Sequence, residues 1–335
     1  MVCTSWAATL LDADSLIQHL FTSYNTELRP VQDQGQSVNV SIGMTLISIN
    51  SFDEIAGVIS VSGGLHLSWT DETLTWDPNS YGNLTYITTS LNKIWHPNLF
   101  SADPLAKAFY VGHDQFKVKI MSHGQVSWIN GGLLRGRCIP DVSEFPFDTQ
   151  TCKLEFFPIG YTPSEISFTM VSSAVDLGYF RQNSEFILTG SKTNVQSYVG
   201  DVAEFYLIIQ RRPLNFLVSV IFPIVMLALI NPLVFVLPFT SGERSSYSIT
   251  VLLAFTVYMT VVSDKMPESS DPISYLSYYI LTLLAISTLI VAVNVLQIQI
   301  QANEEKRPLP QWICNLILVL REVDRRVKGN DLDDP

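Results

Sequence analysis

Acidic and hydroxyl-bearing side chains recur at helical spacing in residues 242–264. Successive steps of three and four residues place one set of side chains on a single face of a helix. This set is Glu243, Ser246, Thr250, Leu253, Val257, Thr260 and Asp264. Polar groups in a helix of membrane length normally face protein or water and not lipid. The pattern therefore predicts a helix that lines a pathway for ions.

The flanking segments indicate whether this helix crosses a membrane. By itself it could also pack in a soluble bundle, with Leu253 in a core and Glu243 as a helix cap. Its uncharged stretch, 245–263, is close to the roughly 20 residues that span a bilayer. Charged residues are also absent from 213–242 and 272–303, which a soluble protein would rarely allow. These three stretches favour a membrane protein.

The membrane part is expected to cover 212–303 as an all-α bundle with three visible spans. The approximate bounds of the spans are 213–239, 243–264 and 273–300. In the first span, Pro223 and Pro232 each remove a backbone hydrogen bond. We therefore expect a helix that is kinked or locally loosened at these positions.

Basic residues gather after the third span, in 304–335. They are Lys306, Arg307, Arg321, Arg325, Arg326 and Lys328. Such an excess is typical of the cytoplasmic side, so the N-terminal half is expected outside the cell, in a plasma-membrane protein. Two sequons, at Asn39 and Asn83, agree with this orientation and predict glycosylation at both asparagines.

The composition argues against several other functions. The chain carries 20 Lys and Arg against 31 Asp and Glu, a net charge of -11. It has no basic stripe for phosphate groups, so nucleic acid is not an expected partner. An acidic surface would instead concentrate cations. Because no metal-ligand cluster, nucleophile motif or phosphate loop is visible, the sequence predicts neither an enzyme nor a cofactor.

Residues 1–211 have the pattern of a separate extracellular β domain. A short helix within 14–28, capped by Asp14 or Ser15, is predicted by four apolar residues at helical spacing: Leu16, Ile17, Leu20 and Phe21. After Pro30, many short runs of alternating apolar residues are separated by Gly, Pro and Asn. This pattern predicts an immunoglobulin-like β-sandwich.

The chain has four cysteines, which allow at most two disulfides. Cys138 and Cys152 enclose a loop whose turn carries Phe145, Pro146, Phe147 and Asp148. A disulfide between them would stabilise the fold by about 3 kcal/mol in the chain-entropy model. The alternative is two free thiols. No role is assigned to Cys3 or Cys314.

Several motifs occur together in this chain. One is a WxDxxLxWxP pattern, formed by Trp69, Asp71, Leu74, Trp76 and Pro78. The others are Trp95 with Pro97, the Cys138–Cys152 loop with its Phe-Pro-x-Asp turn, and Gly242-Glu243-Arg244 before the hydroxyl-striped helix. Together they resemble the Cys-loop family of pentameric ligand-gated ion channels, most closely invertebrate-type subunits like those of nicotinic acetylcholine receptors.

The resemblance implies five subunits around a central pore, most simply a homopentamer in the lipid bilayer. Glu243 would form an acidic ring at the cytoplasmic mouth, and Asp264 would attract cations at the outer mouth. Ser246 and Thr250 would replace part of the ion's hydration, and Leu253 and Val257 would form apolar rings that could close the pore by dewetting. Arg244 is rotated by about 100° from Glu243 and would face protein or solvent. The expected permeant species are cations.

The resemblance also implies a route that couples the ligand site to the pore. Asp53 and Glu54 match a membrane-facing loop of the family, and Arg211 matches the arginine that pairs with its acid. Phe145, Pro146, Phe147 and Asp148 would press on the turn that ends at Pro272. The alternative for Glu54 and Arg211 is an ordinary surface pair worth at most about 1 kcal/mol.

The expected agonist site departs from the family pattern. Nicotinic-type sites hold a quaternary amine between aromatic rings by cation–π attraction. The positions of three such rings fall on Ala102, Ile159 and Gly64, and the fourth region keeps only Tyr198 as an aromatic. Nearby aromatic candidates are Tyr161 and Trp128. Since each missing ring removes up to ~2 kcal/mol, acetylcholine is not expected to be the extracellular small-molecule ligand.

The family's fourth membrane helix is expected to be missing from this chain, because residues 311–320 are too few to span a bilayer. The sequence therefore predicts a subunit of a homopentameric, cation-selective ligand-gated channel. The alternative is an accessory or non-conducting subunit that binds ligand or partners within a heteropentamer.

Overall fold

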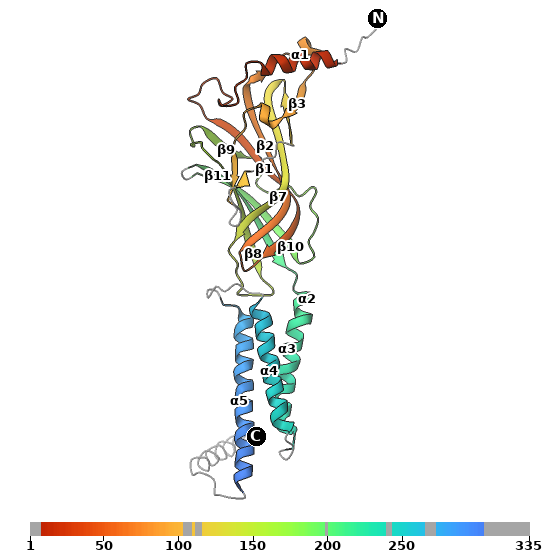
Figure 1. Ribbon diagram of the computed structural model, residues 1–335, viewed down its shortest axis with the longest axis vertical. Coiled ribbons are helices and arrows are strands. Elements are labelled where there is room, and N and C mark those ends of the chain that lie inside the picture. The colour runs from red at the N-terminus through yellow and green to blue at the C-terminus, as the bar shows by residue number, and fades with distance from the viewer. Residues whose placement is uncertain are drawn as a thin grey trace, which may run out of the picture. The chain divides into compact units, whose positions relative to one another are not determined.

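The computed structural model describes residues 8–102, 109–110, 116–197, 200–238, 243–264 and 273–304. The chain divides into two compact units (Figure 1). The first is built by the chain up to Pro213. The second contains Leu214–Asp264 and the residues from Ile273 onward.

The first unit opens with helix α1 (Leu10–Phe21). Thr9 caps it: the Thr9 hydroxyl accepts from the backbone N–H of Asp12, and the Asp12 carboxylate accepts from the backbone N–H of Thr9. This reciprocal capping box starts the helix four residues before the expected cap at Asp14, so that expectation was wrong. Leu16 and Leu20 are buried against the sheet, as their spacing predicts.

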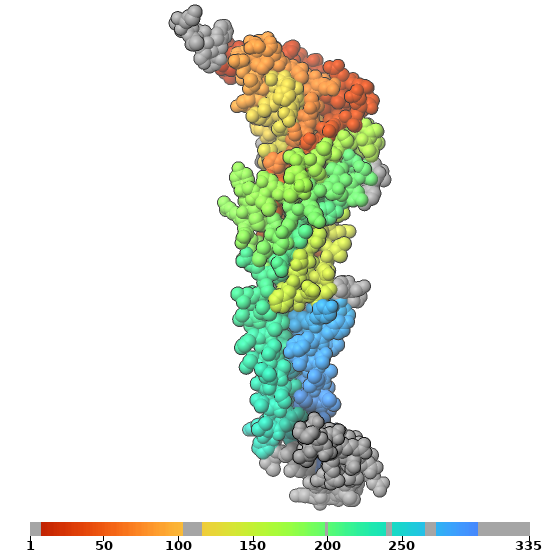
Figure 2. Space-filling view, turned by 180° about the vertical axis from the view of Figure 1, so that it is seen from behind, coloured from red at the N-terminus to blue at the C-terminus, as the bar shows by residue number. Residues whose placement is uncertain are grey.

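The described strands of this unit form the predicted β-sandwich. One layer has the order β9-β1-β2-β7, with β6 and β3 continuing from β7. Its strands are β1 (Val38–Asp53), β2 (Val58–Thr75), β3 (Tyr86–Ser90), β6 (Lys117–Met121), β7 (His123–Cys138) and β9 (Ile166–Met170). Figure 2 shows the early strands (red to orange) lying against the yellow β6–β7 region, although the two are far apart in the sequence.

The other layer has the order β10-β11-β8, with the short strands β4 and β5 beside β8. Its strands are β4 (Leu99–Ser101), β5 (Phe109–Tyr110), β8 (Thr149–Pro158), β10 (Phe186–Ser197) and β11 (Asp201–Arg211). The layers join where β7 meets β8, through the pairs Arg137–Lys153 and Cys138–Cys152. Alternate residues of both layers fill one apolar core, which includes Trp69 and Trp95 in edge-to-face contact at 6.0 Å. Two short 3-10 helices, η1 (Pro78–Tyr81) and η2 (Leu91–Lys93), connect β2, β3 and β4.

The first span of the second unit is irregular at both prolines, as predicted. It consists of α2 (Leu214–Phe216), a π-helical stretch η3 (Leu217–Ile221), α3 (Phe222–Ile230) and a 3-10 stretch η4 (Asn231–Val236). The π-helical stretch ends just before Pro223, and Pro232 lies in the first turn of η4. Each proline lacks the N–H that a regular α-helix would use, and the backbone changes its hydrogen-bond spacing there.

The second unit continues with α4 (Glu243–Ser263) and α5 (Tyr275–Glu304), which pack against each other. Three stretches are long and apolar enough to cross a membrane: Leu214–Val236, Glu243–Ser263 and Tyr275–Ile300. The three predicted spans are therefore confirmed. The expectation of a missing fourth helix concerns residues 311–320, which lie outside the described residues.

Candidate functional site

Helix α4 exposes all of the side chains predicted to form its polar stripe. Within the second unit these residues are solvent-exposed: Glu243, Ser246, Thr250, Leu253, Val257, Thr260 and Asp264. Leu253 and Val257, the two apolar members, each keep 59% of their surface exposed. A large aliphatic side chain so exposed on a packed helix marks a face that its own chain leaves uncovered.

The opposite side of α4 packs against α3, η4 and α5. Its buried residues are Arg244, Ser248, Val251, Phe255 and Val262. Arg244 is only 1% exposed, and its guanidinium carbon lies 5.5 Å from the centre of the Phe235 ring. The Tyr247 hydroxyl donates to the carbonyl oxygen of Ile230 at 2.7 Å. Arg244 therefore points into protein, and these contacts set the rotation of α4 that leaves the stripe outside.

The hydroxyl groups of the two threonines in the stripe donate hydrogen bonds to backbone carbonyls of their own helix. Thr250 Oγ1 donates to the carbonyl of Ser246 at 2.8 Å, and Thr260 Oγ1 donates to the carbonyl of Val257 at 2.7 Å. Each hydroxyl has one proton and two acceptor lone pairs. Because the proton is engaged, each oxygen presents lone pairs outward, which suits cations better than anions.

A second cluster surrounds Arg211 at the end of β11. Its Nη2 lies 2.6 Å from Glu54 Oε1, and its Nε lies 2.8 Å from Asp148 Oδ1. The rings of Phe145 and Phe186 cover the guanidinium at 4.9 and 5.0 Å. Burial alone would lower the pKa of Arg211, but Asp148 and Glu54 outweigh it and the pKa is raised.

Burial rules out the ordinary surface pair that the sequence left open for Glu54 and Arg211. The side chain of Asp148 is 1% exposed, and those of Arg211 and Glu54 are 14% and 18% exposed. Ion pairs withdrawn from water in this way depend strongly on both partners. The cluster joins three segments of the first unit: the β1–β2 turn, the disulfide loop and the end of β11.

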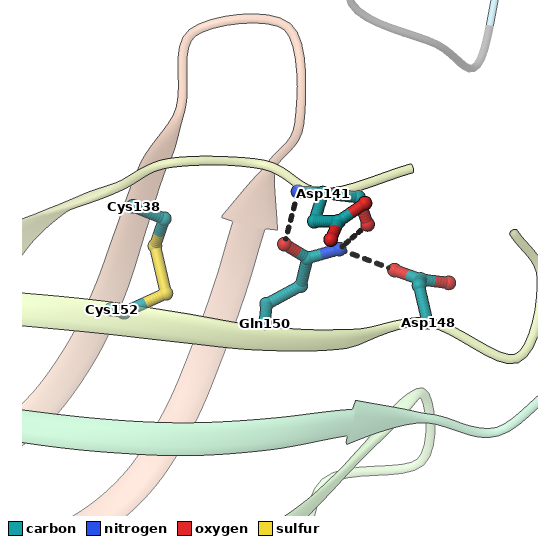
Figure 3. The surroundings of a disulfide bond; sticks show 5 residues. All are labelled: Cys138, Asp141, Asp148, Gln150 and Cys152. Atoms are coloured by element: carbon teal, nitrogen blue, oxygen red, sulfur yellow. Dashed lines mark hydrogen bonds between the residues drawn. A yellow bond between two sulfur atoms is a disulfide. The ribbon is translucent and has the colours of Figure 1, made fainter. Parts of the chain in front are cut away.

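Cys138 and Cys152 form the disulfide between paired residues of β7 and β8. Gln150, which is 1% exposed, is hydrogen-bonded to two residues of the loop that the disulfide encloses (Figure 3). Its amide accepts from the backbone N–H of Asp141 at 3.0 Å and donates to the carbonyl of Asp141 at 2.8 Å. It also donates to Asp148 Oδ2 at 2.6 Å, so the glutamine links the loop to the Arg211 cluster.

Sequence reasoning missed Gln150, although a signal was present. Gln150 stands two residues before Cys152, and residues i and i+2 of a strand share a face. In the structure both are buried on the inner face of β8. A polar residue at a buried strand position requires hydrogen-bond partners. The disulfide loop was the nearest source of them.

The other residues expected to take part in coupling are more dispersed. Asp53 is exposed, and its carboxylate accepts from the backbone N–H of Ala56. Phe147 is 55% exposed, and Pro146 lies beside the buried Phe145. Pro272 lies outside the described residues. Among the described residues of this set, the structure brings together Glu54, Phe145, Asp148 and Arg211.

The expected ligand-site positions are divided between the two layers. Ala102 and Ile159 lie at opposite ends of the β4–β8 pairing, where Ala102 N donates to Glu155 O and Ile159 N donates to Asn98 O. Gly64 lies in β2 between β1 and β7, and a Cβ there would come within 3.2 Å of the Asn130 carbonyl oxygen. At the position where the family has an aromatic ring, Gly64 therefore lies close to the backbone of the neighbouring strand β7.

Two of the aromatic candidates, Trp128 and Tyr161, pack wholly or partly in the core. Trp128 is 1% exposed and packs near His96, so it offers no accessible ring to a ligand here. Tyr161 is half-buried, and its hydroxyl accepts from Trp95 Nε1 at 3.2 Å. Tyr198 lies outside the described residues.

Two phenylalanines that sequence reasoning missed lie beside these positions. Phe100 of β4 pairs with Phe157 of β8, and their ring centroids are 5.1 Å apart. Both are partly exposed, and each precedes an expected wall, Ala102 or Ile159, by two residues. Residues i and i+2 of a strand share a face. The aromatic pair therefore occupies the face on which the missing walls were expected.

Both predicted glycosylation sites are exposed. Asn39 lies on β1, where its side-chain oxygen accepts from the Thr169 hydroxyl. Asn83 follows η1 and has a positive φ of 69°. Attachment of glycans at either asparagine remains a prediction.

A disulfide-looped β-sandwich followed by three apolar helices, one with an uncovered polar stripe, defines a membrane receptor of two parts. Family models agree in both parts: the neurotransmitter-gated ion-channel ligand binding domain matches residues 13–213, and the neurotransmitter-gated ion-channel transmembrane region matches residues 220–326. The chain belongs to the neurotransmitter-gated ion-channel family. Members of this family are channels and not enzymes, and their ligand-binding domain lies outside the cell.

Similar curated proteins include acetylcholine receptor subunits. The chain is 30% identical over 323 residues to the acetylcholine receptor subunit delta of Rattus norvegicus, covering 90% of this chain and 62% of that protein. It is 31% identical over 312 residues to the neuronal acetylcholine receptor subunit alpha-10 of Homo sapiens, covering 90% and 69%. The chain spans about three fifths of the length of the first of these relatives.

Proposed function

We propose that this chain is a subunit of a cation-selective, ligand-gated channel, and that five identical copies surround a pore lined by α4. The observation that carries the proposal is the uncovered stripe of α4, which leaves Leu253 and Val257 each 59% exposed. Members of the family assemble as pentamers, and a ring of five α4 helices would turn these side chains toward a common axis. Leu253 and Val257 then form the apolar constriction that closes the pore.

Selectivity for cations is supported by the charge at the two ends of the stripe. Glu243 and Asp264 are exposed at opposite ends of α4, and the one basic residue of this helix, Arg244, is buried. Thr250 and Thr260 present oxygen lone pairs between them. Five copies would form two acidic rings, and helix α4 itself adds no exposed basic residue to them, which favours the entry of cations.

The extracellular ligand is proposed to differ from acetylcholine. Ala102, Ile159 and Gly64 stand where a quaternary amine would need aromatic rings. Strands β4 and β8 instead present Phe100 and Phe157 in contact with each other, which makes an apolar surface and not an open cage. We place the first contacts of the ligand on this pair.

The Arg211 cluster is proposed to transmit binding toward the pore. Arg211 ends β11, a strand that is paired on its two sides with β10 and with β8. Its ion pairs to Glu54 and Asp148 tie movement of that strand to the β1–β2 turn and to the disulfide loop, where Phe147 is exposed. Phe147 and the turn ending at Pro272 are the proposed next contacts.

An accessory role in a heteropentamer is the second candidate, favoured by the missing aromatic walls. Expression of the chain alone in oocytes, with surface labelling and sizing of the solubilised complex, separates the two. Surface pentamers that conduct cations in response to a screened ligand support the first proposal. Surface expression that requires a second subunit supports the accessory role, and an anion-selective current contradicts the proposed pore.

A further inference from the structure

A cleft of about 380 Å³ opens where helix α1 ends and the chain runs toward β1. It lies in the first unit, and its lining residues are Leu20, Ser23, Tyr24, Asn25, Leu28, Arg29, Pro30, Val31, Gln32, Gln34 and Thr73. Leu20, Leu28 and Val31 and the ring of Tyr24 give it apolar walls, and Arg29 gives it a charge. Five uncharged polar residues complete the lining: Ser23, Asn25, Gln32, Gln34 and Thr73. The volume lies within the roughly 300–1,000 Å³ that is typical of small-molecule sites.

The charged residue that lines this cleft is basic, whereas the whole chain is acidic. The chain has 31 acidic and 20 basic residues, yet no acidic residue lines the cleft. The Arg29 guanidinium donates to the backbone carbonyls of Gln34, Gln36 and Glu165. Among the described residues, no carboxylate oxygen lies within 4.0 Å of it. Since an arginine has five N–H donors, two remain for a ligand.

Asp33, in the segment that lines the cleft, accepts from the backbone N–H of Gly35 at 2.9 Å, and two further acids near Arg29 are engaged elsewhere. Glu165 accepts from the backbone N–H and the hydroxyl of Thr162, both at 2.8 Å. Those bonds lower the pKa of Glu165, and the positive charge of Arg29 adds to the effect. Glu72, at the edge of the cleft, accepts from the backbone N–H of Gln32 at 2.7 Å. Neither acid neutralises Arg29 by direct contact.

The polar atom of Tyr24 is also engaged. Its hydroxyl donates to Asp71 Oδ2 at 2.6 Å and accepts from the backbone N–H of Trp95 at 3.0 Å. Asp71 is fully buried and takes two further bonds from Thr73. The tyrosine therefore offers only its ring, and Arg29 is the charged group with donors to spare.

We propose that this cleft binds a small organic anion with an apolar body, such as an aryl-alkyl carboxylate. The carboxylate accepts from Arg29, and the body lies against Leu20, Leu28 and Val31. The site is independent of the proposed pore and of the Phe100–Phe157 surface, because its walls come from the α1–β1 segment and from Thr73. Hydrogen bonds to a charged partner of this kind typically exceed those between neutral groups in strength.

The test uses the full chain in lipid nanodiscs with 4-phenylbutyrate as the probe. Its neutral analogue, 4-phenylbutanol, is the matched ligand control. Saturation-transfer NMR and calorimetric titration are expected to show binding of the acid at least about tenfold tighter than that of the alcohol, a ratio that corresponds to 1.4 kcal/mol. Equal affinities for acid and alcohol, or no binding of the acid up to its solubility limit, overturn the proposal.

Three variants locate the site. Leu28→Glu places an acid at the rim on a residue that is already 55% exposed, so the fold is retained, and it should weaken phenylbutyrate at least about tenfold. Glu72→Gln keeps the acceptor for Gln32 but removes a negative charge, and it should strengthen binding. Leu177→Glu, on a residue 43% exposed outside the cleft lining, is the control and should change nothing. If Leu28→Glu and Leu177→Glu act alike, the anion binds elsewhere and the assignment fails. Because the readout is binding and not current, its result is separate from that of the channel proposal.

Discussion

Arg211 and Asp148 are joined twice, through the backbone and through the side chains. The backbone N–H of Arg211 donates to the carbonyl of Asp148 at 3.2 Å, and Arg211 Nε donates to Asp148 Oδ1 at 2.8 Å. The second contact alone would orient a side chain. The two together fix the end of β11 to the disulfide loop.

Arg211→Gln is therefore expected to be strongly destabilising. It leaves the nearly fully buried Asp148 without its cation, and breaking a buried pair in this way costs about 3–5 kcal/mol. Thermal unfolding of the purified protein and its surface yield would measure the loss. Arg212→Gln is the matched control, because Arg212 is exposed and its guanidinium donates to the side chain of Gln182, an uncharged partner. Adding Asp148→Asn to Arg211→Gln should recover part of the stability, and a purely additive loss would contradict the coupling.

Glu204 should make the first unit sensitive to acid. It is 1% exposed in β11. Burial would raise the pKa of Glu204, but hydrogen bonds from Asn194, Tyr206 and Lys153 outweigh it and hold the pKa below its ordinary value of 4.5. The stabilisation is therefore present above about pH 4.5 and is lost as the pH falls through the lowered pKa of the folded protein.

The unfolding temperature measured between pH 6 and pH 3.5 would test this. The wild type should lose stability more steeply than Glu204→Gln over this window, because the glutamine has no proton to take up. Glu155→Gln serves as the control, since its side chain is 26% exposed. Parallel curves for wild type and Glu204→Gln would show that another group governs the acid response.

Glu243→Ala should weaken the preference for cations. In the proposed pentamer it removes five carboxylates from one mouth of the pore, while Thr250 and Thr260 keep their oxygens in place. Reversal potentials under a sodium chloride gradient measure the change, and a shift toward the chloride potential is expected. Glu185→Ala, which changes an exposed acid of the first unit, is the control. Unchanged potentials in Glu243→Ala would remove this residue from the pore.

Acetylcholine is expected to give no current at micromolar concentration. The three expected ring positions are Ala102, Ile159 and Gly64, and each missing ring costs up to ~2 kcal/mol of cation–π binding. Once a ligand has been found by screening, Phe157→Ala should raise its half-maximal concentration at least about tenfold, by loss of apolar contact. Tyr179→Ala, at a residue 75% exposed, is the control. Robust micromolar acetylcholine currents would refute the proposed ligand site.

The parts of the fold that follow a regular period could be predicted from the sequence. Strand alternation predicted the sandwich, and the uncharged spans predicted three helices. The polar stripe was predicted because a helix repeats every 3.6 residues. The start of α1 was missed because the capping box at Thr9 and Asp12 lies ahead of the apolar pattern, and its acid is Asp in place of the usual Glu.

The parts that depend on contacts distant in the sequence could not be predicted. The pairing of Phe100 with Phe157 needs the register between β4 and β8, which no local pattern specifies. The burial of Trp128 likewise depends on which face of β7 meets the core. Arg211 and Glu54 were matched through the family, but that Asp148 would lie nearly fully buried beneath the pair emerged only in three dimensions.

The π-helical stretch at Leu217–Ile221 determines which side chains of the first span share a face. A π-helical turn holds one residue more than an α-helical turn, so it rotates the side chains that follow by about 100° relative to an uninterrupted α-helix. Residues 214–216 and 222–230 therefore present faces that a regular helix could not present together. Deleting one residue within the stretch would turn residues 214–216 by about 100° relative to residues 222–230, while Pro223 would still lack its backbone donor.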